Sequence, residues 1–85
     1  MIAYSEEEIE AEVKRIVAEI ASIDVTKIDS NVRLKALGLD SMMALEIMSG
    51  VERRFDLRIQ EEDLLKMVSV AAAVKLIAGY ISKAN

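Results

Sequence analysis

Hydrophobic residues recur with the period of an α-helix near the start of the chain. The apolar stripe consists of Ile9, Val13, Ile16, Val17 and Ile20. This spacing predicts an amphipathic helix that ends at about Ala21. Ser5 followed three residues later by Glu8 forms a capping box, and Tyr4 and Ile9 occupy the two positions of a hydrophobic staple. These signals place the start of the helix at Ser5.

The next stretch, SIDVTKIDSNVRLKALGLD over residues 22–40, follows no regular period. Single apolar residues alternate irregularly with Asp, Ser, Thr and Asn, which is typical of a long ordered loop. A loop of this length stays in place only if apolar residues hold it against the core. We expect the anchors to be Ile23, Val25, Ile28, Val32, Leu34, Leu37 and Leu39.

A second helix is predicted from Ser41 to about Phe55, with Asp40 offering a side-chain acceptor at its start. The inward stripe consists of Ala44, Ile47, Met48, Val51 and Phe55. The opposite, outward face consists of Met42, Glu46, Ser49 and Arg53. Met42 is therefore an apolar side chain predicted to face water beside Ser41, which indicates a contact surface.

The segment EEDLLKM, residues 61–67, predicts a third helix of one or two turns, and Ser69 can cap a fourth. The inward positions of the fourth helix are Val70, Ala73, Val74, Ile77 and Ile81, and Lys83 suits its negative end. The sequence thus predicts an all-α bundle of three main helices plus one short helix, with a long loop between the first two. We expect residues 1–85 to form a single domain.

Composition narrows the function. The 85 residues include no Cys and no His, which removes disulfides, the usual zinc sites and Ser-His or Cys-His nucleophile pairs. We therefore expect neither an enzyme nor a metal-binding protein. The net charge of −4 argues against nucleic acid. The acidic start lacks a signal-peptide layout, and no apolar run reaches the roughly 20 residues that span a bilayer, so we expect a soluble cytoplasmic protein without membrane insertion. We also expect a monomer, since a small acidic domain can work without a second copy.

Ser41 is the candidate for chemistry. A hydroxyl in the first turn of a helix lies where unpaired N–H groups and the helix dipole favour an anion, including a phosphodiester on that hydroxyl. Spacing alone favours a simpler interpretation, in which Asp40 and Ser41 merely cap the helix.

The residues around Ser41 favour an attachment site over a simple helix cap. The stretch LGLDSMMALEIMSGVERRF, residues 37–55, resembles the G-x-D-S-[LM] attachment motif of phosphopantetheine-binding carrier proteins, the acyl carrier family. In that family the motif serine receives the arm, an apolar residue follows, a Glu lies five positions on, and an aromatic or aliphatic residue closes the helix. Ser41, Met42, Glu46 and Phe55 occupy these places. The similarity extends into the preceding loop and the last helix.

The resemblance implies that a phosphopantetheinyl transferase moves a 4'-phosphopantetheine arm from coenzyme A to Ser41. Acyl intermediates of fatty acid, polyketide or related biosynthesis would then be held on the arm as thioesters. The chemistry would belong to the cofactor and to partner enzymes, namely synthases, transferases and reductases. Asp40 and Gly38 complete the cofactor-binding set, with Gly38 allowing a tight backbone conformation.

Partner recognition in this family commonly uses the second helix, whose acidic residues meet basic rims. The residues implied here are Met42, Met43, Glu46, Ser49, Glu52 and Arg53. Arg53 and Arg54 stand where fatty-acid carriers usually continue with acidic residues, and Met43 replaces a commonly polar position. The run DSMMALEIMSGVERRFDLRI, residues 40–59, looks closer to carriers of polyketide or mixed peptide assembly lines. Alternatively, the two arginines are solvated cations at a helix C-terminus.

Other interpretations remain open. The chain could be an unmodified helical docking module, or, within the family, a peptidyl or aminoacyl carrier. A small hydrolase using Asp and Glu pairs is a further alternative. If the chain is a carrier, we expect the short third helix to yield and a cavity for the acyl chain to be lined by Ile59, Leu64, Leu65 and Met67.

Overall fold

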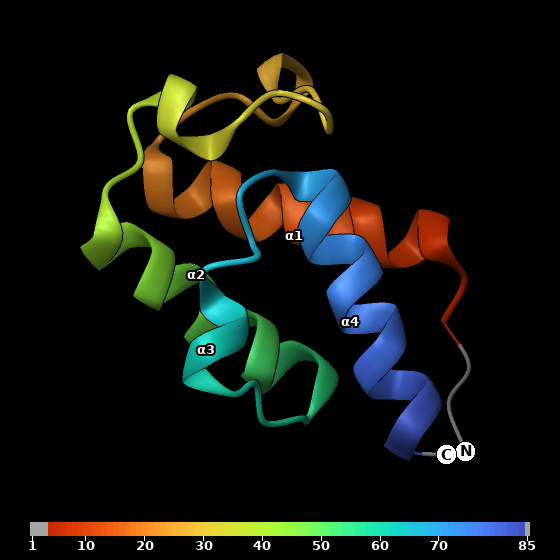
Figure 1. Ribbon diagram of the computed structural model, residues 1–85. Coiled ribbons are helices and arrows are strands. Elements are labelled where there is room, and N and C mark those ends of the chain that lie inside the picture. Colours follow the sequence, from red (N-terminus) through yellow and green to blue (C-terminus); the bar gives the residue numbers. More distant parts are fainter. Residues whose placement is uncertain (1–3, 85) are drawn as a thin grey trace.

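The computed structural model describes residues 4–84 and is all-helical over that range (Figure 1). Residues 1–3, which belong to the acidic start considered above, lie outside it. The α-helices are α1 (Glu6–Ala21), α2 (Ser41–Phe55), α3 (Glu61–Leu64) and α4 (Val70–Ala84). Two 3₁₀ turns, η1 (Val25–Lys27) and η2 (Leu34–Leu37), lie in the long loop. The predicted bundle of three main helices and one short helix is confirmed.

The predicted capping box starts α1. The Ser5 hydroxyl accepts from the Glu8 N–H at 3.1 Å, and the Glu8 carboxylate accepts from the Ser5 N–H at 3.0 Å. Two N–H groups that a helix start would leave unpaired are thereby satisfied. The helix ends at Ala21, and the C-cap residue Ser22 has a left-handed φ of 57°.

The core lies where α1 crosses α4 and α2 (Figure 1). The buried side chains of the three long helices are Ile9, Val13, Ile16, Val17, Ile47, Val51, Phe55, Val70, Ala73, Val74 and Ile77. The remaining predicted inward residues, Ile20, Ala44, Met48 and Ile81, are half-buried. The helical periodicity therefore identified the inward faces correctly, because one face of each long helix packs against the other helices.

The loop of residues 22–40 is anchored by fewer residues than expected. Ile28, Leu34 and Leu39 are buried, and Ile23 and Leu37 pack against the core from its edge. The prediction is wrong for Val25 and Val32, which are 44% and 37% exposed. Both lie in tight turns closed by aspartate side chains: Asp24 accepts from the Thr26 N–H at 2.9 Å, and Asp29 accepts from the Asn31 N–H at 2.8 Å. These turns direct the two valines outward.

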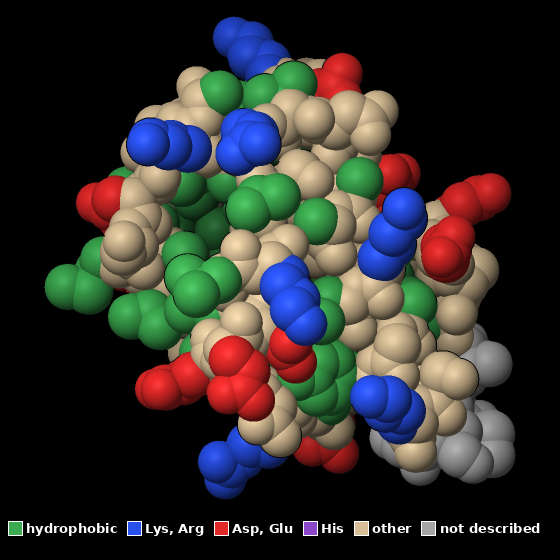
Figure 2. Space-filling model, in the orientation of Figure 1, with side chains coloured by type: hydrophobic (Ala, Val, Ile, Leu, Met, Phe, Trp, Pro, Cys, Tyr) green, Lys and Arg blue, Asp and Glu red, His purple; other side chains and the backbone are tan. Residues whose placement is uncertain are grey.

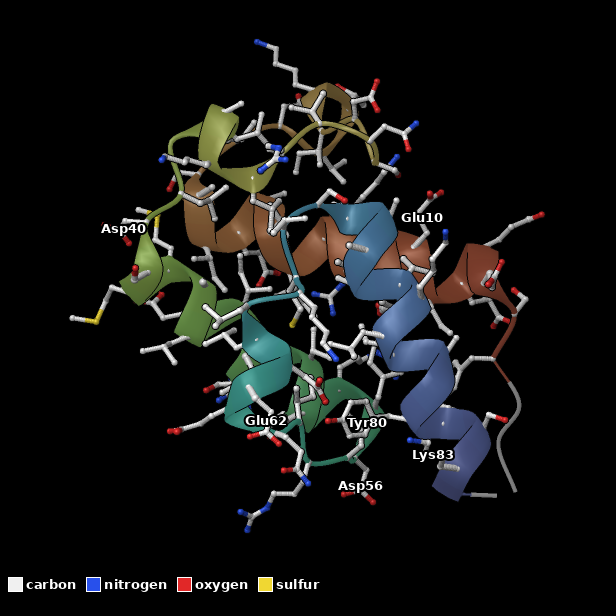
Figure 3. All side chains as sticks on the ribbon, viewed as in Figure 1. Glu10, Asp40, Asp56, Glu62, Tyr80 and Lys83 are labelled. Atoms are coloured by element: carbon white, nitrogen blue, oxygen red, sulfur yellow. The ribbon has the colours of Figure 1, made fainter. Side chains whose placement is uncertain are left out.

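Three hydrogen bonds fix the loop to α1, to α4 and to the segment between α3 and α4. The Ser30 hydroxyl donates to the Glu10 carboxylate of α1 at 2.6 Å, and Glu10 points from α1 towards the loop (Figure 3). The Ser30 carbonyl accepts from the Ala71 N–H of α4 at 2.8 Å, and the Leu34 N–H donates to the Val68 carbonyl at 2.8 Å. The segment that leads into α2 is thus held from both sides.

Candidate functional site

The start of α2 is built by two local features. Gly38 ends η2 with a φ of +88°, a left-handed conformation that glycine adopts without steric cost. Asp40 is the N-cap, and its carboxylate accepts from the Met43 N–H at 2.9 Å. Both features were expected from the sequence. Together they turn the chain sharply so that Ser41 is the first residue of the helix.

Ser41 is exposed in the first turn of α2. Its hydroxyl therefore lies at the positive end of the helix dipole and within reach of solvent. A phosphodiester on this oxygen would not be buried, and it would gain from the dipole. The residues present thus fit an anionic group attached at Ser41.

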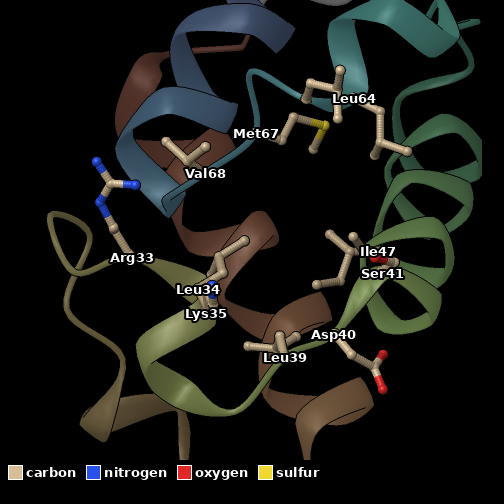
Figure 4. Close-up of a pocket in the computed structure, with 12 residues that line it drawn as sticks. Arg33, Leu34, Lys35, Leu39, Asp40, Ser41, Ile47, Leu64, Met67 and Val68 are labelled. Carbon is tan, nitrogen blue, oxygen red and sulfur yellow. The ribbon is translucent and has the colours of Figure 1, made fainter.

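A hollow of about 520 Å³ opens beside Ser41 (Figure 4). Its largely apolar walls are formed by Leu34, Leu39, Ala44, Ile47, Leu64, Leu65, Met67 and Val68. Asp40 also borders it but points its carboxylate away from the interior (Figure 4). Arg33 and Lys35 line it from the loop and are exposed. No local pattern in the sequence indicated these two cations, because nothing local showed that the loop would lie across from α3.

The predicted cavity lining is confirmed for three residues and wrong for one. Leu64, Leu65 and Met67 border the hollow, but Ile59 does not. Ile59 is buried in the core, and its N–H donates to the Glu52 carboxylate at 2.8 Å. This contact draws the chain after α2 back against that helix, so Ile59 packs inward before α3 begins.

The surface around Ser41 carries several exposed apolar side chains. Met42 is 69% exposed, Leu45 is 43% exposed, and Leu65 of α3 is 82% exposed. Figure 2 shows hydrophobic side chains gathered on the side of the molecule where α2 starts and α3 lies. The sequence identified Met42 and missed Leu45, which sits between the inward and outward faces on a helical wheel. Exposed apolar groups that gather in one place are typical of contact surfaces.

The other residues predicted to bind partners differ in how far they are exposed. Glu46 and Arg53 are exposed, and Ser49 is half-buried. Met43 packs against the core from its edge. Glu52 is half-buried and accepts from the backbone after α2, so its carboxylate has a structural partner.

Arg54 joins α2 to α1. Its Nε donates to the Glu12 carboxylate at 2.8 Å, and its Nη1 donates to the Tyr4 hydroxyl at 3.3 Å. The guanidinium also lies 5.7 Å from the Tyr4 ring centroid and 5.5 Å from that of Phe55. The hydrogen bonds from Arg54, and secondarily from Arg15, lower the pKa of Glu12. Arg54 is therefore engaged within the domain rather than freely solvated.

Carboxyl groups with a clear pKa shift are all held ionised. The pKa is lowered for Glu8 by Ser5, for Asp24 by Thr26, and for Asp63 by Tyr80 and Lys66. A general acid at neutral pH needs a raised pKa instead, so these carboxylates suit helix and turn contacts rather than hydrolysis.

Among residues 4–84, no three His, Cys, Asp or Glu side chains gather as a metal site. No helix in that range has the length and apolarity to cross a bilayer.

The helix order and the exposed serine that opens α2 define a small carrier-type domain. A family profile described as "Phosphopantetheine attachment site" matches residues 11–77, and the chain belongs to that family. The prosthetic group of the family is 4'-phosphopantetheine, held covalently. Its members are carriers that work with synthases and other biosynthetic enzymes and are not themselves catalysts.

Relatives include free-standing carriers and carrier regions of large synthases. The acyl carrier protein of Desulforapulum autotrophicum is 34% identical over 71 residues, covering 81% of this chain and 92% of that protein. A non-reducing polyketide synthase of Emericella nidulans is 31% identical over 65 residues. That match covers 76% of this chain but spans only 2% of the synthase.

The fold is also found in a solved structure. The crystal structure of a free-standing peptidyl carrier protein from Acinetobacter baumannii superimposes with a TM-score of 0.82. The match covers 91% of this chain and 96% of that one, at 19% sequence identity. This likeness confirms the bundle architecture.

Proposed function

We propose that this chain is an acyl carrier protein and that Ser41 bears its 4'-phosphopantetheine arm. One observation carries the proposal: Ser41 is exposed in the first turn of α2, inside the region that matches the attachment-site family. The family relationship supplies the cofactor, and the exposure of Ser41 makes it accessible to a modifying enzyme.

Attachment would form one bond and break one. The Ser41 oxygen forms a phosphoester with the phosphate of the arm, while the pyrophosphate link of coenzyme A breaks and the nucleotide leaves. The serine proton passes to the transferase. Asp40 holds the helix start in place, because its carboxylate accepts from the Met43 N–H. The chain thus supplies the position of the hydroxyl, and a phosphopantetheinyl transferase supplies the base.

The hollow beside Ser41 is suited to an apolar cargo. Its walls are mostly aliphatic, and α3, which forms one of them, is a single turn that buries little area. We propose that acyl groups reach into this hollow when α3 yields. Amide exchange across residues 59–68 of the acylated protein should then be fast at α3. Uniformly slow exchange over that range would count against this part of the proposal.

The exposed apolar side chains Met42, Leu45 and Leu65, with Glu46 alongside, form the proposed docking surface. Partners with an apolar contact patch and a basic rim would fit it. Both acyl carrier proteins and a polyketide synthase are among the relatives, which supports a fatty acid, polyketide or related route. A peptidyl or aminoacyl cargo is the alternative, supported by the fold of the Acinetobacter protein.

Intact mass spectrometry tests the attachment. The purified chain is incubated with coenzyme A and a broad-specificity phosphopantetheinyl transferase. Wild type should gain the mass of one arm, and Ser41→Ala should gain none. Ser5→Ala is a matched control, because Ser5 is also an exposed serine at a helix start. Wild type that gains no mass would favour an unmodified docking module built on the same exposed apolar surface.

A further inference from the structure

The short helix α3 needs support from outside itself. It has only four residues, and an isolated helix of one turn is unstable in water. Its N-cap residue, Gln60, makes no side-chain capping bond. Leu65, which follows it, is largely exposed, so apolar burial holds α3 mainly through Leu64. Other contacts must therefore set the position of this wall of the hollow.

Tyr80 provides such contacts. It points from α4 towards α3 (Figure 3). Its hydroxyl donates to the Asp63 carboxylate and accepts from the Gln60 N–H at 3.0 Å. One phenol oxygen therefore binds both the residue before α3 and a residue within it. The other carboxylate oxygen of Asp63 lies 3.0 Å from the Lys66 ammonium.

The hydrogen bond from Tyr80 to Asp63 belongs to a class that is stronger than hydrogen bonds between neutral groups. A neutral hydroxyl that donates to a carboxylate makes a charge-assisted bond, and this one is part-buried. Its effect is seen in both partners, because Tyr80 lowers the pKa of Asp63 while Asp63 raises the pKa of Tyr80. Lys66, by contrast, is an exposed partner whose ion pair is screened by solvent.

We propose that Tyr80 is a positioning residue: by its contacts with Gln60 and Asp63 it holds α3 closed against the hollow and so sets how often the hollow opens. We call these two contacts of Tyr80 the latch. The latch itself is independent of the arm. Its consequence for cargo rests on the proposed function, because a loosened α3 would expose a bound acyl group to water.

Thiol labelling of the unmodified chain tests the latch. The sequence has no cysteine, so Leu64→Cys and Leu65→Cys each introduce a single reporter thiol. Leu64 is part-buried and borders the hollow, whereas Leu65 is already exposed. Tyr80→Phe should accelerate labelling at position 64 about tenfold or more, since it removes a hydrogen bond to a charged group. Labelling at position 65 should not change.

The control variants separate the latch from a general loss of packing. Tyr4→Phe makes the same chemical change at the only other tyrosine and should leave labelling at position 64 unaltered. Asp63→Ala should act like Tyr80→Phe, and the double variant should label no faster than either single one. Asp63→Asn keeps an acceptor and should restore part of the protection. Unchanged labelling in Tyr80→Phe, or full additivity with Asp63→Ala, would overturn the proposal.

A spectroscopic signature and a cargo assay complete the test. In Tyr4→Phe the only phenol is Tyr80, and adding Asp63→Ala should bring the pKa of Tyr80 down towards the ordinary value; no change would contradict the latch.

In the acylated protein, the Tyr80→Phe variant should lose its thioester to hydrolysis faster than wild type. Equal hydrolysis with faster labelling would overturn the consequence for cargo alone. Failure to attach the arm would refute the proposed function, and labelling would still decide the latch.

Discussion

The guanidinium Nε of Arg54 donates to the Glu12 carboxylate across 2.8 Å and thereby ties the last turn of α2 to α1. The same guanidinium binds the Tyr4 hydroxyl and lies over two aromatic rings. Tyr4 in turn meets Phe55 edge to face, with ring centroids 5.0 Å apart. Arg54 therefore completes a small cluster that closes one end of the bundle.

Replacing Arg54 should weaken the fold more than replacing its neighbour. Arg54→Met removes the ion pair and the cation–π contacts, so its thermal midpoint should fall clearly below that of Arg53→Met, since Arg53 is exposed and has no ion pair among the described residues. Salt screens exposed charges, so the difference between the two thermal midpoints should become smaller at high salt. Melting followed by circular dichroism measures both. Equal midpoints for the two variants would contradict the account.

Acid should remove part of this stabilisation. Hydrogen bonds from Arg54, then Arg15, hold the pKa of Glu12 below its ordinary value of 4.5. A lowered folded-state pKa contributes stability that is present above the unfolded pKa and is lost as pH falls through the folded one. Wild type should therefore lose stability below pH 4.5, and Arg54→Met should lose less over that window. Urea midpoints measured as a function of pH check this. Parallel curves for the two proteins would be inconsistent with it.

The glycines of α2 and α4 should respond oppositely to added side chains. A Cβ on Gly79 would meet nothing within 4 Å, so Gly79→Ala should stabilise by about 0.5 to 1 kcal/mol through helix propensity. A Cβ on Gly50 would lie 3.0 Å from the Ile16 side chain, where α1 and α2 pack closely. Gly50→Leu should destabilise by about 1 to 3 kcal/mol. Urea denaturation measures both, and a stabilised Gly50→Leu would show that the helices separate easily.

Gly38→Ala should cost about 1 to 2 kcal/mol, because residue 38 has a φ of +88° that alanine adopts poorly. Gly38→Asn should cost less, since asparagine tolerates this conformation. A Cβ at Gly38 would meet nothing within 4 Å, so the folded variants should still accept the arm. Denaturation and intact mass give the two readouts. An Ala variant as stable as wild type would refute the role of Gly38.

The features predictable from sequence were local ones. The Ser5 to Glu8 capping box and the Asp40 cap join residues three positions apart, so the sequence alone placed the starts of α1 and α2. Periodicity identified the buried faces of the long helices for the same reason. The attachment role of Ser41 is proposed from the resemblance of residues 37–55 to the family motif, because a cap and the residue after it do not by themselves distinguish an attachment serine from a capping one.

Contacts between distant segments could not be read in this way. Arg54 and Glu12 are 42 residues apart, and Tyr80 and Asp63 are 17 apart, so no spacing rule relates them. In the loop, no period indicates which apolar residues face inward, and the misplacement of Val25 follows from that. The hydrogen bond from the Ile59 N–H to the Glu52 carboxylate is likewise not indicated by any spacing rule.

Fragmentation mass spectrometry of the modified protein shows which residue carries the arm. Fragment ions should locate the added phosphopantetheine on Ser41, with Ser30, Ser49 and every other serine unmodified. An arm found on any other residue, in protein that folds normally, would contradict the account.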